Sequence, residues 1–122
     1  MDELVGLDHV QLAIPKGGEA NARAFYVGLL GLSEIAKPEE LAKRGGAWFV
    51  CGAQQLHVGV EEPFTAAKKA HPALRARDAA SVRAIAARLE AAGHAVRWAQ
   101  EVPGVTRFHV DDPFGNRIEI TD

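Results

Sequence analysis

The chain of 122 residues resembles itself when it is shifted by 62 positions. The shift places apolar residues on apolar residues and glycine on glycine: Leu12 on Leu74, Gly31 on Gly93, Leu56 on Ile118 and Val58 on Ile120. It also places His9 on His71 and His57 on Glu119. Because the shift is close to half of the chain, the pattern predicts a module that was duplicated and that folds twice.

Apolar spacing predicts the same order of elements in each half. Two helices are expected, at about 19–30 and 78–92, and Asp78 and Gly93 provide the start and stop signals of the second. The expected strands are 6–14, 32–36, 46–51, 54–60, 72–77, 95–99, 106–110 and 117–121. The order is strand, helix and three strands, written twice, which predicts an α+β fold of two tandem βαβββ modules. The modules span about 1–61 and 71–122 and form one domain, with a short bridge between them.

Alternation within the predicted strands places the candidate ligands on polar faces. Alternate side chains leave a strand on opposite sides. His9, His57 and Glu119 alternate with the aliphatic residues of their strands. His71, just before the strand at 72–77, shares the polar phase of Arg75, opposite to Leu74. If helices cover the aliphatic faces, all four side chains project from the opposite, concave surface.

Three imidazoles and a carboxylate are donors that suit a divalent cation such as zinc, manganese, nickel or iron. The alternative is that His9, His57, His71 and Glu119 form a hydrogen-bonded polar cluster without metal. His109 shares a polar phase with Arg107 and could line the cavity, but the shift of 62 pairs it with Ala47, so it is left outside the set.

Composition excludes several classes of function. The formal net charge is −2 and no basic stripe is present, so nucleic acid is not an expected partner. No apolar run approaches the roughly 18 residues that span a bilayer, and the N-terminus does not resemble a signal peptide. A single cysteine fits a reducing compartment, and we expect a cytoplasmic protein.

The motifs then resemble those of the vicinal oxygen chelate superfamily, which includes glyoxalase I, fosfomycin- and bleomycin-resistance proteins and extradiol dioxygenases. The resemblance rests on segments along the whole chain: 7–10 (LDHV), 24–26 (AFY), 30–32 (LGL), 55–58 (QLHV), His71 and 112–119 (DPFGNRIE). It implies that the sheets of the two modules form an open cup around a metal, with His9, His57, His71 and Glu119 as ligands.

The resemblance also implies a range of activities. We expect a metal-dependent enzyme of the lyase or isomerase type, whose small substrate chelates the metal through two adjacent oxygens. Glu119 or His57 would carry the proton. Gln11, Gln55, Arg75 and Arg107 are the candidates that position the substrate. Two alternatives stay open, an extradiol-type iron(II) dioxygenase and a metal-free binding protein of the bleomycin-resistance kind.

The sequence does not determine the oligomeric state. Sheets of short strands have edges that must be covered, so we expect a homodimer. Each metal site would be completed either within one chain or across two.

Overall fold

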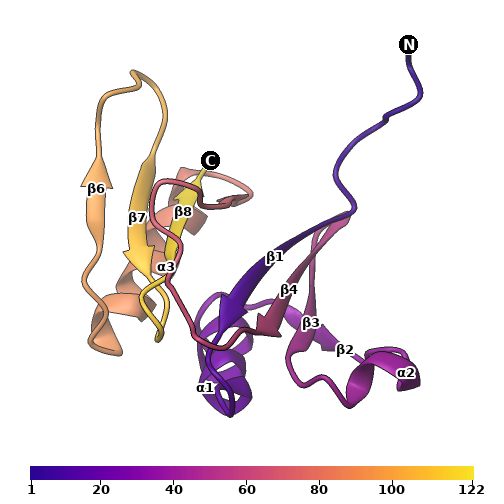
Figure 1. Ribbon diagram of the computed structural model, residues 1–122. Coiled ribbons are helices and arrows are strands. Elements are labelled where there is room, and N and C mark those ends of the chain that lie inside the picture. Colours follow the sequence, from indigo (N-terminus) through magenta and orange to yellow (C-terminus); the bar gives the residue numbers. More distant parts are fainter.

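The computed structural model describes residues 1–122 and contains two four-stranded sheets (Figure 1). Module 1 contains β1 (His9–Ile14), β2 (Ser33–Ile35), β3 (Ala47–Cys51) and β4 (Gln54–Val60), in the sheet order β1-β4-β3-β2. Module 2 contains β5 (Ala73–Arg75), β6 (Arg97–Ala99), β7 (Arg107–Asp111) and β8 (Arg117–Thr121), in the order β5-β8-β7-β6. The predicted α+β fold of two tandem modules is confirmed.

One long helix packs in each module. In module 1 it begins as α1 (Glu19–Arg23) and continues as a wider π-helical segment, Ala24–Leu29. In module 2 it is α3 (Ala79–Ala91), whose N-terminus is capped by Asp78 through a 2.8 Å hydrogen bond from the Ser81 amide. The π-helical turn and the short helix α2 (Glu39–Ala42) were not predicted.

The helices cover the aliphatic faces of the sheets, as alternation predicted. The core is one cluster shared by both modules, and its largest members include Phe25, Tyr26, Phe49, Leu56, Leu89, Phe108 and Ile118. Helix α3 contacts both β8 and the π-helical segment of module 1. The polar faces of the sheets are therefore left on the side away from the helices. None of the helices has the length and the apolar character needed to cross a membrane.

The strand bounds differ from the prediction mainly at their ends. The first strand begins at His9 rather than Gly6, and residues 1–8 form no helix or strand. Figure 1 shows this N-terminal segment projecting away from both sheets. The edge strands β2, β5 and β6 are each three residues long, shorter than expected. Strand propensity alone does not determine where an edge strand begins and ends, because an edge strand pairs on only one side.

The register of the strands matches the repeat. Gln11 lies opposite His57 in the β1–β4 pair, and Ala73 lies opposite Glu119 in the β5–β8 pair. Both pairs are parallel, and the shift of 62 converts one into the other. The two candidate ligands of the last strands, His57 and Glu119, therefore occupy equivalent backbone positions.

At the neighbouring strands, β3 and β7, the correspondence between the two modules is displaced by one residue. His57 lies opposite Trp48, and Glu119 lies opposite His109. His109 therefore corresponds to Trp48, and the sequence-based pairing of His109 with Ala47 is wrong. The cause is one additional residue in the module 2 hairpin, which has residues 112–116 where module 1 has 51–54 between equivalent strand partners.

Candidate metal centre

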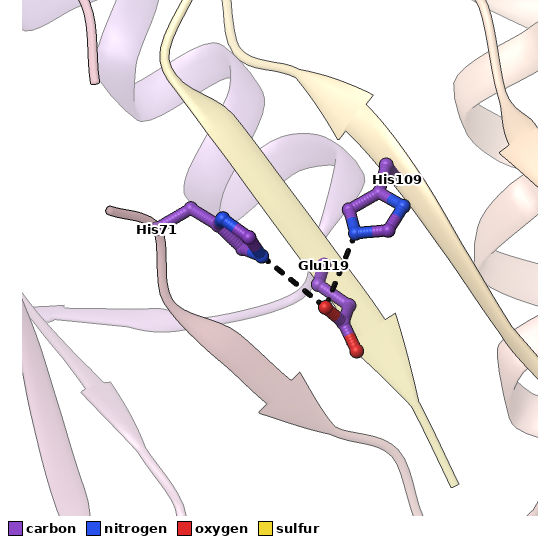
Figure 2. A group of neighbouring side chains, drawn as sticks. All are labelled: His71, His109 and Glu119. Atoms are coloured by element: carbon purple, nitrogen blue, oxygen red, sulfur yellow. Dashed lines mark hydrogen bonds and ion pairs between the residues drawn. The ribbon is translucent and has the colours of Figure 1, made fainter. Parts of the chain in front are cut away.

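Three side chains with atoms that can bind a metal meet on the polar face of module 2 (Figure 2). His71 lies just before β5, His109 lies on β7 and Glu119 lies on β8. One ligand atom from each lies within 4.8 Å of the others, and all three residues are partly buried. This is the one such group in the chain, and we call it the carboxylate cluster.

Glu119 is the centre of this cluster. Its Oε1 lies 3.2 Å from Nε2 of His71 and 3.1 Å from Nε2 of His109. Its Oε2 accepts a 2.9 Å hydrogen bond from Nη1 of Arg107. Burial raises the pKa of Glu119, but the hydrogen bonds from Arg107 and His71 outweigh burial and bring the pKa below its usual value. The carboxylate is therefore ionised at neutral pH.

The surroundings of His71 determine which of its nitrogens can bind a cation. Its Nδ1 lies 2.9 Å from the carbonyl oxygen of Lys69 and 3.1 Å from that of Lys68. A carbonyl oxygen only accepts, so Nδ1 carries the hydrogen. In a neutral ring, Nε2 then presents a bare lone pair to the Glu119 carboxylate. Two acceptors that face each other need either a second proton on the ring or a cation between them.

A different group occupies the polar face of module 1. The rings of Trp48, His57 and His9 lie one upon another, with centroids 4.1 Å apart at each step and interplanar angles of 4° and 16°. We call this group the ring stack. His57 is buried in its middle, and its Nε2 lies 2.8 Å from Oε1 of Gln55. Burial, followed by the nearby His9, lowers the pKa of His57.

The structure thus brings the four predicted ligands together in pairs. His71 and Glu119 are hydrogen-bonded in module 2, and His9 and His57 are stacked in module 1. His9 and His71 both line a cleft of about 570 Å³ between the edge strands β1 and β5. All four do not form one cluster within the chain.

The predicted substrate-positioning residues fall into two groups. Gln11, Gln55 and Arg75 line the cleft. Arg107 does not line it, since its guanidinium is held by Glu119 and Glu101. The Nε of Arg107 is buried and has no hydrogen-bond partner. Its role is therefore tied to the carboxylate of Glu119 in this structure.

The residue that sequence reasoning missed is His109. Its polar phase, shared with Arg107, was the available indication, but the shift of 62 removed it from the set. The extra hairpin residue could not be located from the sequence, because an insertion in a turn leaves the apolar pattern on both sides intact.

The fold and the site together define a protein of two βαβββ modules with imidazole and carboxylate side chains on the polar faces of its sheets. The family model of the Glyoxalase/Bleomycin resistance protein/Dioxygenase superfamily matches residues 6–120. The chain belongs to this superfamily. No curated protein matches the sequence.

Solved structures agree with this assignment. A glyoxalase family protein from Bacillus anthracis is 48% identical, with a TM-score of 0.93 over 99% of this chain and 97% of that chain. Lactoylglutathione lyase from Agrobacterium tumefaciens is 23% identical, with a TM-score of 0.76 and coverage of 98% and 94%. A genomically encoded fosfomycin resistance protein from Listeria monocytogenes is 16% identical, with a TM-score of 0.77 and coverage of 97% and 93%. The last two share the fold.

Proposed function

We propose that the protein is a metal-dependent enzyme of the glyoxalase-like lyase or isomerase type. Its substrate is a small molecule that offers two adjacent oxygens to a zinc, manganese, nickel or iron ion. The observation that carries this proposal is the 3.2 Å contact between Nε2 of His71, whose Nδ1 faces backbone carbonyl oxygens, and Oε1 of Glu119. The two side chains would hold a divalent cation between these two atoms.

His71 and Glu119 would provide two ligands from one chain, and His9 would provide a third. The Nδ1 of His9 lies 2.9 Å from Oδ2 of Asp8, which leaves Nε2 as the donor atom. Because His9 lies outside the carboxylate cluster, we propose that the third ligand comes from a second copy of the chain. A homodimer would then carry two equivalent sites.

The residues of the chain divide the chemical work. A bound cation would supply Lewis acidity, which stabilises negative charge on the substrate oxygens. Glu119 is ionised and would accept a proton at Oε1 if one of its contacts opens. Gln11, Gln55 and Arg75 line the cleft beside His9 and His71 and would orient the substrate.

The two alternatives have less support. Extradiol dioxygenases use an acid–base tyrosine near the metal, but the only tyrosine here, Tyr26, is buried in the core and donates a 2.7 Å hydrogen bond to Asp112. A metal-free binding protein would need an aromatic surface. The sequence offers Trp48, Phe49 and Trp98 for it, but Phe49 is buried in the core and Trp48 lies under His57. Trp98 is 45% exposed, but it packs against Phe108 and so lies on the face of its sheet opposite to His109.

Metal content tests the proposal. Untagged protein purified without chelator should contain about one metal ion per chain, and His71→Ala should lose it. His94→Ala is the matched control, because His94 lies outside both groups and packs edge-on against Phe25. Less than about a tenth of a metal ion per chain in the wild type, unchanged in His71→Ala, would refute metal dependence.

The shared site and the substrate class need separate tests. If His9 and His71 act across two chains, mixing His9→Ala chains with His71→Ala chains creates one intact site in each mixed dimer. The mixture should therefore recover metal binding that neither variant has alone, whereas sites within one chain recover none. For the substrate class, acetohydroxamate is a suitable probe because it chelates through two adjacent oxygens. It should change the visible spectrum of Co²⁺-loaded protein, and an unchanged spectrum argues against an open chelating site.

A further inference from the structure

The ring stack runs across three neighbouring strands of module 1. Trp48 lies directly opposite His57 in the β3–β4 pair, and His9 lies on β1, the strand on the other side of β4. Trp48 is parallel to His57 within 4°, and His9 is parallel to His57 within 16°. Each face of the His57 imidazole is therefore covered by another ring, and 4% of the residue is exposed.

Parallel stacking decides whether His9 and His57 can bind the same cation. An imidazole nitrogen donates its lone pair in the plane of the ring, and a metal lies about 2.1 Å away in that plane. Two nearly parallel rings with centroids 4.1 Å apart define planes that do not meet near either nitrogen. One ion therefore cannot lie in both planes, and His9 and His57 cannot ligate it together in this arrangement.

The hydrogen bonds at the ring edges distinguish the two histidines further. His9 is held at Nδ1 by Asp8 and keeps Nε2 free, in the same way that His71 is held at Nδ1 by backbone carbonyls. Ligating histidines usually have such a partner on the other nitrogen. His57 has the opposite arrangement, because its Nε2 is the atom that contacts Gln55.

We infer that His57 is a positioning residue: backed by Trp48, its flat ring supports the ring of His9 and aims Nε2 of His9 at the metal. This inference rests on the proposed function for the metal, and it competes with the sequence-based prediction that His57 is itself a ligand or a base. What the position requires is a flat ring rather than a nitrogen donor. A positioning role and a ligand role predict different metal affinities for the variants His57→Phe and His57→Ala.

The first measurement uses metal-free protein, so it does not depend on metal binding. The imidazole carbon-bound protons of His9 should be shifted upfield by the ring current of His57. In His57→Phe the upfield shift should remain, and in His57→Ala it should disappear. If the His9 resonances are the same in His57→Ala as in the wild type, the two rings do not stack and the inference is wrong.

The second measurement is the Co²⁺ affinity and visible spectrum of the same variants. His57→Phe should bind Co²⁺ within about threefold of the wild type with an unchanged spectrum, whereas His57→Ala should bind about 10-fold to 100-fold more weakly. Trp48→Ala should weaken binding in the same direction, because it removes the support beneath His57. If His57→Phe loses binding as severely as His9→Ala, His57 is a ligand and the inference fails.

The two proposals fail in different ways. If wild-type protein binds no metal while the His9 shift responds as expected, the metal function is wrong and the stack remains. If metal binds and His57→Phe abolishes it, the metal function stands and the positioning role is overturned.

Discussion

The two modules have the same backbone register and opposite chemistry on their polar faces. The position of His57 in module 1 is that of Glu119 in module 2, and Trp48 corresponds to His109. Module 1 therefore has a stack of rings where module 2 has a carboxylate between two imidazoles. The comparison shows that the duplicated frame fixes where side chains lie, and that their identities then decide whether a face packs rings or holds charge.

A third pair of positions completes the contrast. Ala47 corresponds to Phe108, so Gly46, the residue before it, corresponds to Arg107. Arg107 donates to Glu119 and holds its charge. Gly46 has no side chain, and its φ of +82° brings it against the carbonyl of Val58. At these positions module 1 therefore has neither the carboxylate of Glu119 nor the guanidinium of Arg107. The absence of the guanidinium fits the absence of the carboxylate that it holds in module 2.

The largest effect is expected at Gly46. Gly46→Ala places a Cβ in overlap with the backbone carbonyl oxygen of Val58 and forces alanine into a left-handed conformation. The free energy of unfolding should fall by about 4 kcal/mol, about 1–2 of it from the conformation and the rest from the displaced strand. Urea unfolding measures the change. Gly104→Ala, with a φ of +79° and open space around its Cβ, is the control and should cost about 1–2 kcal/mol. Equal losses would mean that the backbone contact is unimportant.

The hairpins provide the next contrast. In module 1 the β3–β4 turn is Gly52-Ala53, whereas the longer turn of module 2 is built around buried Asp112. Asp112 accepts hydrogen bonds from Tyr26, from the Phe114 amide and from both the amide and side chain of Asn116. Asp112→Ala should therefore destabilise the protein by about 3 kcal/mol, because it leaves several buried donors unpaired.

Tyr26→Phe separates the contributions to this network. It removes a single donor and should cost about 1 kcal/mol, measured by the same urea unfolding. A loss in Tyr26→Phe as large as that in Asp112→Ala would show that the Tyr26 contact alone holds the turn.

The fold was predictable because its determinants are periodic. Helix α3 has its apolar stripe, its Asp78 cap and Gly93 after its end, all of which can be identified from the sequence. The strands β4 and β8 matched their predicted bounds because each alternates aliphatic and polar residues over its whole length. The short edge strands were less well predicted because little packing holds their ends.

The site was predictable only in part, for a physical reason. Alternation gives the face of a side chain, but not which other side chains it meets. It identified His9 and His57 as candidate ligands, but not the stacking that separates their lone pairs. The shift of 62 excluded His109, because one additional turn residue changes the correspondence between the modules. Contacts between strands depend on register, and a hairpin of unknown length leaves the register undetermined.

The charge on Glu119 gives a further prediction. In metal-free protein, Glu119→Gln should lower the free energy of unfolding by about 2 kcal/mol at neutral pH, because Arg107 loses its partly buried charged partner. The folded pKa of Glu119 is lowered, so its stabilisation is complete above the unfolded pKa and is lost as the pH falls through the folded pKa. The difference between wild type and variant should therefore shrink in acid. Glu101→Gln is the control, because Glu101 also contacts Arg107 but is exposed, and it should change little.

The smallest effect is expected at the equivalent position of module 1. Because burial lowers the folded pKa of His57, the unfolded chain takes up this proton more readily than the folded chain does. Stability is therefore complete above the unfolded pKa, near 6.5, and declines as the pH falls from there toward the folded pKa. Below the folded pKa there is no further loss. His57→Phe should remove this slope from the urea midpoint below about pH 6.5 and leave the acid loss of Glu119 in place. If the slope persists in His57→Phe, the ring in the middle of the stack is not the group that titrates, and the two equivalent positions differ less than their contacts indicate.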